Sequence, residues 1–182
     1  MTDKIEELVK NECTGSSFGP SFFDEHVAVV ADYAARLAGP LGADTEVVTL
    51  GAWLHDLAAV RDPAAQPEHP RLGAELAPRV LAPYQYDRAV VEQVCRAVAS
   101  HSFPLEPGSA SPEEVCLSQA DAVAQMVRPF YWLYFVTSVR GLDYGQAKKW
   151  LANLLASKWD ALAAPARLLV GERCKVAIEL LG

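Results

Sequence analysis

Residues 51–60, GAWLHDLAAV, place the adjacent pair His55-Asp56 inside an apolar stretch of helical character. Burying either side chain without a partner costs roughly 2–7 kcal/mol for a neutral polar group and more for a charge. Neighbours on a helix point about 100° apart, so one ligand at the boundary of their two faces can satisfy both. A metal cation is such a ligand. The alternative is a core histidine bonded to a backbone carbonyl beside a solvated aspartate.

The composition is that of a folded, soluble domain. The chain has 182 residues, of which 51% are hydrophobic and 21% charged. This balance fits one globular domain with a sizeable core and not a disordered segment. The formal net charge of −7 argues against a broad basic surface for duplex nucleic acid. A small anionic substrate would therefore need locally placed Arg or Lys side chains.

Cysteine spacing and the lack of long apolar segments predict a cytoplasmic protein without a membrane segment. The cysteines have no CxxC spacing and are interpreted as reduced thiols, neither a disulfide framework nor a zinc cluster; they are Cys13, Cys95, Cys116 and Cys174. The N-terminal segment MTDKIEELVK lacks the apolar core of a signal peptide. The most apolar run, residues 130–139, is far shorter than the roughly 20 residues of a membrane span.

Apolar residues recur at helical spacing along the chain, without convincing strand alternation. The strongest helix start is Ser111-Pro112-Glu113-Glu114, which combines an N-cap, a proline at the first helical position and a glutamate at the third. Pro78 is expected to kink or end its helix. We predict an all-α, single-domain bundle of about eight helices, with helical segments at about 3–12, 21–37, 44–60, 69–81, 87–100, 111–127, 129–139, 143–159 and 165–181.

Four histidines and two aspartates fall on inward helical faces or at helix boundaries. They are His26, His55, His69, His101, Asp56 and Asp121. These side chains can converge only if the helices bundle around one site. Nitrogen and oxygen ligands of this kind suit Fe, Mn, Zn, Co or Ni better than Ca²⁺, and the set contains no thiolate for copper(I).

Five segments in a fixed order resemble the HD-domain superfamily of metal-dependent phosphohydrolases. They are FFDEHVAVVADYAARLA (22–38), LGAWLHDLAAV (50–60), EHPRLGAELA (68–77), AVASHS (97–102) and LSQADAVAQM (117–126). The resemblance covers about residues 20–128. The helices of residues 129–182 lie outside it and are expected to pack on this core within one domain spanning 1–182.

The resemblance implies a divalent transition metal (Fe, Mn, Ni, Co or Zn, with Mg also open) held by His26, His55, Asp56 and Asp121. In members with two metals, Asp56 would bridge to a second ion completed by His69 and His101. We expect two ions, with Asp56, His69 and His101 as catalytic residues. In single-metal members, histidines near the last two places instead contact phosphate. Arg128, two helical turns after Asp121, is the first candidate to bind the negative charge of the substrate.

The resemblance implies a phosphomonoesterase or phosphodiesterase that uses a metal-activated water on a small phosphate ester or nucleotide. Many members carry Lys or Glu where this chain has Ala59, and many two-metal members have a second histidine at Ser102. The tyrosine-proline signature of the cyclic-dinucleotide branch is absent. Two alternatives stay open, a mixed-valence di-iron oxygenase similar to myo-inositol oxygenase and a non-catalytic metal-binding sensor. The apolar C-terminal helices leave a homodimer open.

Overall fold

Helices make up the regular secondary structure of the computed structural model, which describes residues 2–102, 105 and 108–181. Within these ranges the prediction of an all-α domain is confirmed. Eight α-helices have ten residues or more: α1 (Thr2–Cys13), α2 (Ala28–Leu41), α3 (Thr45–Leu54), α5 (His69–Leu81), α6 (Arg88–Ser100), α7 (Pro112–Val127), α9 (Tyr144–Ala161) and α10 (Ala164–Leu181). Shorter helical segments connect them: η1 (Phe23–Val27), α4 (Leu57–Arg61), η2 (Pro63–Glu68), η3 (Ala82–Tyr84), α8 (Pro129–Tyr134) and η4 (Phe135–Val139).

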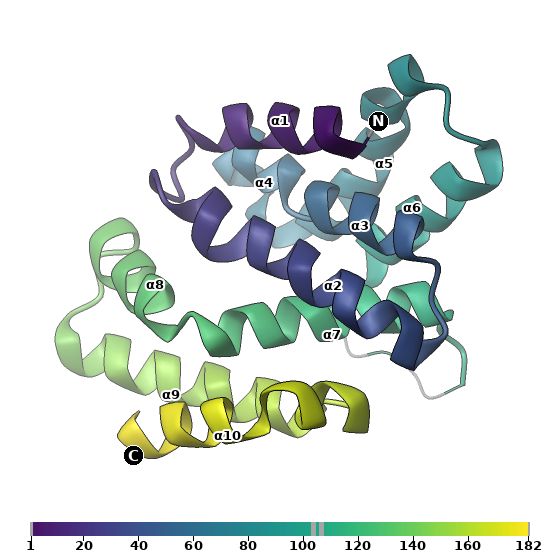
Figure 1. Cartoon of the computed structure of the whole chain (residues 1–182). Helices are drawn as coiled ribbons and strands as arrows, with labels where there is room; N and C mark the ends of the chain where they lie inside the picture. Colours follow the sequence, from purple (N-terminus) through teal and green to yellow (C-terminus); the bar gives the residue numbers. More distant parts are fainter. Residues whose placement is uncertain (1, 103–104, 106–107, 182) are drawn as a thin grey trace.

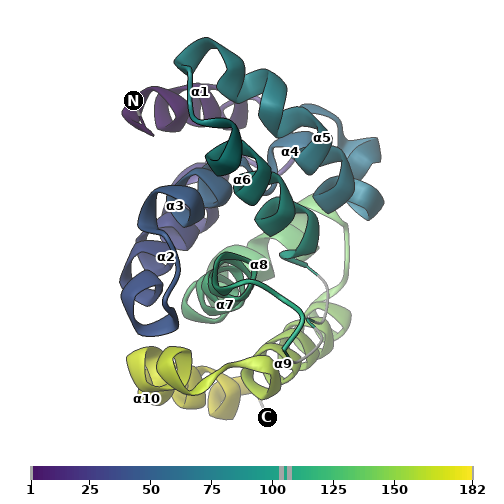
Figure 2. The same ribbon diagram turned by 90° about the vertical axis from the view of Figure 1, so that its right-hand side faces the viewer.

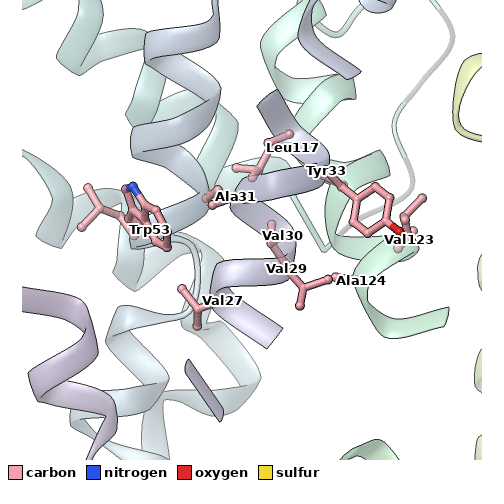
Figure 3. Close-up of a cluster of buried hydrophobic side chains, with 14 of the residues drawn as sticks. Val27, Val29, Val30, Ala31, Tyr33, Trp53, Leu117, Val123 and Ala124 are labelled. Atoms are coloured by element: carbon pink, nitrogen blue, oxygen red, sulfur yellow. The ribbon is translucent and has the colours of Figure 1, made fainter. Parts of the chain in front are cut away.

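Helix α7 is the central element of the bundle. It contacts α2, α3 and α6 on one side and α9 and α10 on the other, and Figure 2 shows it end-on between these layers. Most of its side chains are buried, whereas an ordinary surface helix buries one stripe. Part of the surrounding core is shown in Figure 3, where Tyr33 of α2 and Val123 of α7 belong to one apolar cluster.

Capping residues fix the start of α7 as the sequence predicts. The Ser111 hydroxyl accepts a hydrogen bond from the Glu114 backbone N–H at 3.3 Å, and the Glu114 carboxylate accepts one from the Ser111 N–H at 2.9 Å. The end of α2 was expected near Leu37, which is wrong, because the helix continues through Pro40 to Leu41. Gly42 then adopts a left-handed conformation (φ 71°) that ends it.

The expected continuous helix over residues 44–60 is interrupted at His55-Asp56. Helix α3 ends at Leu54 and α4 begins at Leu57. Asp56 departs from regular helical geometry with φ −103° and ψ 0°. Because of the interruption, both side chains point to the same site. In a regular helix they would point about 100° apart. Pro78 does not end α5, which continues to Leu81.

The C-terminal helices α9 and α10 form a layer under α7 (Figure 1). Gln119 of α7 hydrogen-bonds to the turn between α9 and α10. Its side-chain amide donates to the Ala161 carbonyl at 3.1 Å and accepts from the Ala163 N–H at 2.6 Å. This layer therefore belongs to the same helical domain as the segment that carries the histidines. Among the described helices, none is both long and apolar enough to cross a membrane.

Candidate metal centre

The structure brings the six side chains singled out in the sequence to one place. They come from η1, the α3–α4 junction, the start of α5, the end of α6 and the middle of α7: His26, His55 with Asp56, His69, His101 and Asp121. His26, His55, His101 and Asp121 are buried, and Asp56 and His69 are partly exposed. Polar side chains gathered in a largely buried site need mutual partners or a cation.

The first cluster contains His26, His55 and one oxygen of Asp56. The two Nε2 atoms lie 3.1 Å apart, and each lies 3.2 Å from Asp56 Oδ2. Asp121 extends this cluster, because its Oδ1 lies 3.4 Å from His26 Nε2.

The second cluster contains His69, His101 and the other oxygen of Asp56. The two Nε2 atoms are 3.2 Å apart, and Asp56 Oδ1 lies 3.2 Å from that of His69 and 3.9 Å from that of His101. The Asp56 carboxylate therefore faces both clusters, one oxygen to each.

Three of the histidines occupy C-cap positions, immediately after a helix ends: His55 after α3, His69 after η2 and His101 after α6. Each ring hydrogen-bonds through Nδ1 to a carbonyl three residues earlier that the helix end leaves available. The acceptors are the carbonyl oxygens of Ala52, Gln66 and Val98, at 2.7, 2.8 and 2.7 Å. A carbonyl can only accept, so Nδ1 carries a proton, and in the neutral ring the Nε2 lone pair points into the cluster.

These donors fit a metal ion. Two imidazole lone pairs about 3 Å apart repel each other unless a proton or cation lies near both. Metal–nitrogen distances of roughly 2.0–2.1 Å imply neighbouring ligand atoms roughly 3 Å apart, close to the separations in both clusters. Nδ1–carbonyl hydrogen bonds are also the usual way in which a protein orients a metal-binding histidine. The residues present could therefore hold one cation in each cluster.

Charge inside the centre is unevenly distributed. Burial by itself lowers the pKa of His55, but pairing with Asp56 outweighs it and raises this pKa to about 9. Burial raises the pKa of Asp56, whereas the neighbouring histidines hold it well below its usual range. Burial and the nearby His55 charge lower the pKa of His101 to about 4. Without a metal, His55 is therefore protonated at neutral pH and His101 is not.

A cavity of about 190 Å³ opens over both clusters. Five of the six ligand candidates line it, all except His55, together with aromatic side chains from the chain beyond α7, Trp132, Phe135 and Trp150. Trp132 packs its ring against the edge of His26, with centroids 5.1 Å apart. The aromatic run after α7 therefore both packs the core and lines the candidate site.

Arg128 is not brought to the clusters. The expectation that it continues the helical face of Asp121 fails, because α7 ends at Val127 and Arg128 leaves helical geometry with φ −124° and ψ 50°. Its Nε lies 3.3 Å from Glu25 Oε2, its side chain is 42% exposed, and it does not line the cavity.

Ala59, at the position three residues after Asp56 where the resemblance leads us to expect Lys or Glu, is fully buried. Three charged residues that follow Ala59 in the chain, Arg61, Asp62 and Glu68, could take over such a role only if they were free, and each has another partner. Arg61 pairs with Glu12 at 2.7 Å, Asp62 caps η2 through the Ala64 N–H, and Glu68 pairs with Arg71 at 2.8 Å.

Two positively charged side chains near the site were not predicted from the sequence. Lys158 of α9 lies with Nζ 3.5 Å from Asp121 Oδ2, and Arg140, after η4, lines the cavity. No local spacing connects either of them to the histidines. Gln125, which donates to both Asp121 oxygens at 2.9 and 3.0 Å, could have been found, because it follows Asp121 by four residues on α7.

Comparison with known proteins agrees with this arrangement. The family model for the HD domain matches residues 23–126, which include all six ligand candidates. The chain belongs to the HD domain family. This family of hydrolases binds divalent metals, and its assignment confirms the resemblance found in the sequence.

Sequence relatives include ribonuclease Y of Cutibacterium acnes, 34% identical over 125 residues, and that of Pseudothermotoga lettingae, 31% identical over 109 residues. These alignments cover 68% and 60% of this chain but only 21% and 19% of the relatives. The chain thus spans about a fifth of the curated relatives that it matches.

Solved structures with the same fold include Bacillus subtilis YpgQ in complex with ADP, with a TM-score of 0.70 and 20% identity, covering 100% of this chain and 94% of YpgQ. An HD superfamily hydrolase from an uncultured Thermotogales bacterium gives a TM-score of 0.67 at 18% identity, covering 98% of this chain and 88% of that protein. At these identities the likeness concerns the fold, and it extends over the C-terminal helices.

Lys158 offers a test of the charge balance at Asp121. Burial alone would raise the pKa of Asp121. The positive charges of Lys158 and the histidines outweigh this effect and lower the pKa below its ordinary value, so the carboxylate is ionised. We expect Lys158→Met to reduce the free energy of unfolding of the metal-free protein by about 1–3 kcal/mol, because a buried charge loses its partner. Urea unfolding in the presence of a chelator measures this change.

Lys149→Met provides the matched control, since Lys149 is an exposed lysine of the same helix. An equal loss of stability in both variants, or none in either, contradicts the role assigned to the Lys158–Asp121 pair.

Proposed function

We propose that this chain is a metal-dependent phosphohydrolase acting on a small phosphate ester or nucleotide. The observation that carries the proposal is the Asp56 carboxylate, which offers one oxygen to each of two histidine pairs. A carboxylate between two groups of nitrogen donors suits a pair of divalent ions better than a structural ion, whose coordination would be closed.

One ion would be held by His26, His55, Asp56 and Asp121, and a second by Asp56, His69 and His101. When bound, such ions supply a water nucleophile acidic enough to ionise at about pH 7 and neutralise phosphate charge. Asp56, His69 and His101 would lie closest to the reacting phosphate, because Asp56 and His69 are partly exposed and all three line the cavity. Arg128 has no part in the proposal, since it pairs with Glu25 elsewhere.

The chain itself orients the donors and limits access to them. The Nδ1–carbonyl bonds at three helix ends hold the neutral imidazoles in one tautomer, and access to the donors is through a cavity of about 190 Å³. Ser102 is a further candidate for contact with phosphate oxygens, because its hydroxyl lies 3.3 Å from His69 Nε2 and lines the cavity.

The comparisons support phosphate chemistry. Relatives named ribonuclease Y act on RNA, a phosphodiester, and the fold neighbour YpgQ has been seen with ADP. These names leave both a phosphomonoesterase and a phosphodiesterase within the proposal. The di-iron oxygenase alternative is less favoured, because the place of its charged substrate-binding residue holds the buried Ala59.

We place this activity in the cytoplasm, without a membrane or duplex nucleic acid as partner. The four cysteines are all free, and the net charge of −7 disfavours a duplex. Phe130 of α8 and Leu180 of α10 are exposed and line a common apolar groove, which offers a surface for a homodimer.

Purified protein is expected to carry a transition metal, and Asp56→Ala should lose most of it, because Asp56 contributes to both clusters. Elemental analysis of the two proteins measures this. Asp32→Ala is the control, since Asp32 is an exposed aspartate of α2 that pairs with Arg36. Equal absence of metal from wild type and Asp56→Ala contradicts the proposed centre.

The number of ions depends on His69 and His101. Replacing either with alanine should lower the metal content from two ions per chain toward one, because the first cluster keeps His26, His55 and Asp121. Stoichiometry by elemental analysis after dialysis decides the point. If wild type and both variants each hold a single ion, these histidines are phosphate contacts in a one-metal site.

The reaction class is tested without oxygen. Protein loaded with Mn²⁺, Co²⁺, Ni²⁺ or Mg²⁺ should release phosphate or a phosphomonoester from nucleotides and small phosphate esters under anaerobic conditions, because hydrolysis consumes only water. Turnover that requires both iron and dioxygen would establish the oxygenase alternative. Metal binding without turnover of any compound in the panel would favour the sensor.

A further inference from the structure

Arg140 is the one lysine or arginine among the described residues that line the cavity over the two clusters. Its backbone is fixed at the end of η4, where its N–H donates to the Phe135 carbonyl at 3.1 Å. Its guanidinium carbon lies 5.4 Å from the centroid of the Phe135 ring. Phe135 is itself buried and lines the cavity, so this contact keeps the positive charge beside the opening.

The guanidinium has no carboxylate partner within the described part of the chain. Five other arginines do form such pairs: Arg36, Arg61, Arg71, Arg88 and Arg128. In a chain with a net charge of −7, an arginine that borders a cavity and keeps its fork of N–H donors available is suited to an anionic ligand.

The ligand candidates and Arg140 come from different parts of the fold. The six histidines and aspartates lie between η1 and α7, whereas Arg140 follows η4 and lines the cavity together with Trp150 of α9. A compound that contacts both must extend across the cavity and carry negative charge at each end. A second anionic group on such a compound would give Arg140 a partner while the first group is held at the clusters.

We propose that Arg140 is a specificity-determining residue that binds a second phosphate of the substrate, so that diphosphate-containing compounds are preferred over monophosphates. This inference rests on the proposed function, because the first phosphate is assigned to the histidine–aspartate clusters. The arginine would bind the phosphate that does not react and so set the orientation of the substrate.

The test compares two non-hydrolysable probes, inorganic phosphate and imidodiphosphate, in which nitrogen replaces the bridging oxygen. Their dissociation constants are measured by calorimetry on the full chain with Mn²⁺ in excess. Wild type should bind imidodiphosphate more tightly than phosphate. Arg140→Gln should weaken imidodiphosphate binding roughly tenfold or more while changing phosphate binding little, because one charge-assisted contact is lost. Arg140→Lys should recover part of the loss.

Arg128→Gln is the matched control, since Arg128 already pairs with Glu25 away from the cavity. The inference is overturned if Arg140→Gln binds imidodiphosphate as wild type does, if both probes weaken equally, or if wild type shows no preference between them. Metal analysis of the same samples separates this result from the proposed function. A metal-bound wild type without a preference for imidodiphosphate leaves the centre intact and removes only the role of Arg140.

Discussion

Everything in the site depends on how one carboxylate, that of Asp56, stabilises four imidazoles packed against one another. Each oxygen of Asp56 faces a pair of histidines whose Nε2 atoms are 3.1 or 3.2 Å apart. Helix ends orient three of these imidazoles. His55, His69 and His101 each follow the last residue of a helix and hydrogen-bond to a carbonyl that the helix end leaves free. The break between α3 and α4 is thus a requirement of the site, since an unbroken helix would turn His55 and Asp56 apart.

Much of this could be predicted from the sequence, because the relevant signals are local. Helical periodicity and caps indicate the helices, and the order of histidines and aspartates indicates the family. The failures have physical causes that no local pattern encodes. Arg128 follows Asp121 at helical spacing, yet α7 ends one residue before it. Lys158 and Arg140 reach the site only because α9 packs beside α7 and η4 packs against α9, and such tertiary contacts leave no periodic trace in one sequence.

The segment matched by the family model and the helices beyond it have different tasks. Residues 23–126 supply all six ligand candidates, whereas the chain after α7 supplies Trp132, Trp150 and Arg140 to the cavity. Gln119 joins the two parts through its bonds to the α9–α10 connection. The ligand candidates and the side chains that face them across the cavity therefore come from separate parts of the chain.

The balance of charge explains why the two clusters should behave differently. Asp56 and Asp121 are both ionised, and in the metal-free protein the protonated His55 and Lys158 offset them. A cation entering the first cluster must displace the His55 proton, so its binding weakens as pH falls below about 9, the pKa of that histidine. His101 is already neutral at pH values above about 4, so it presents a free lone pair throughout the neutral range. Its cluster has fewer carboxylate oxygens and wider spacing, which suits a more weakly held ion beside the substrate.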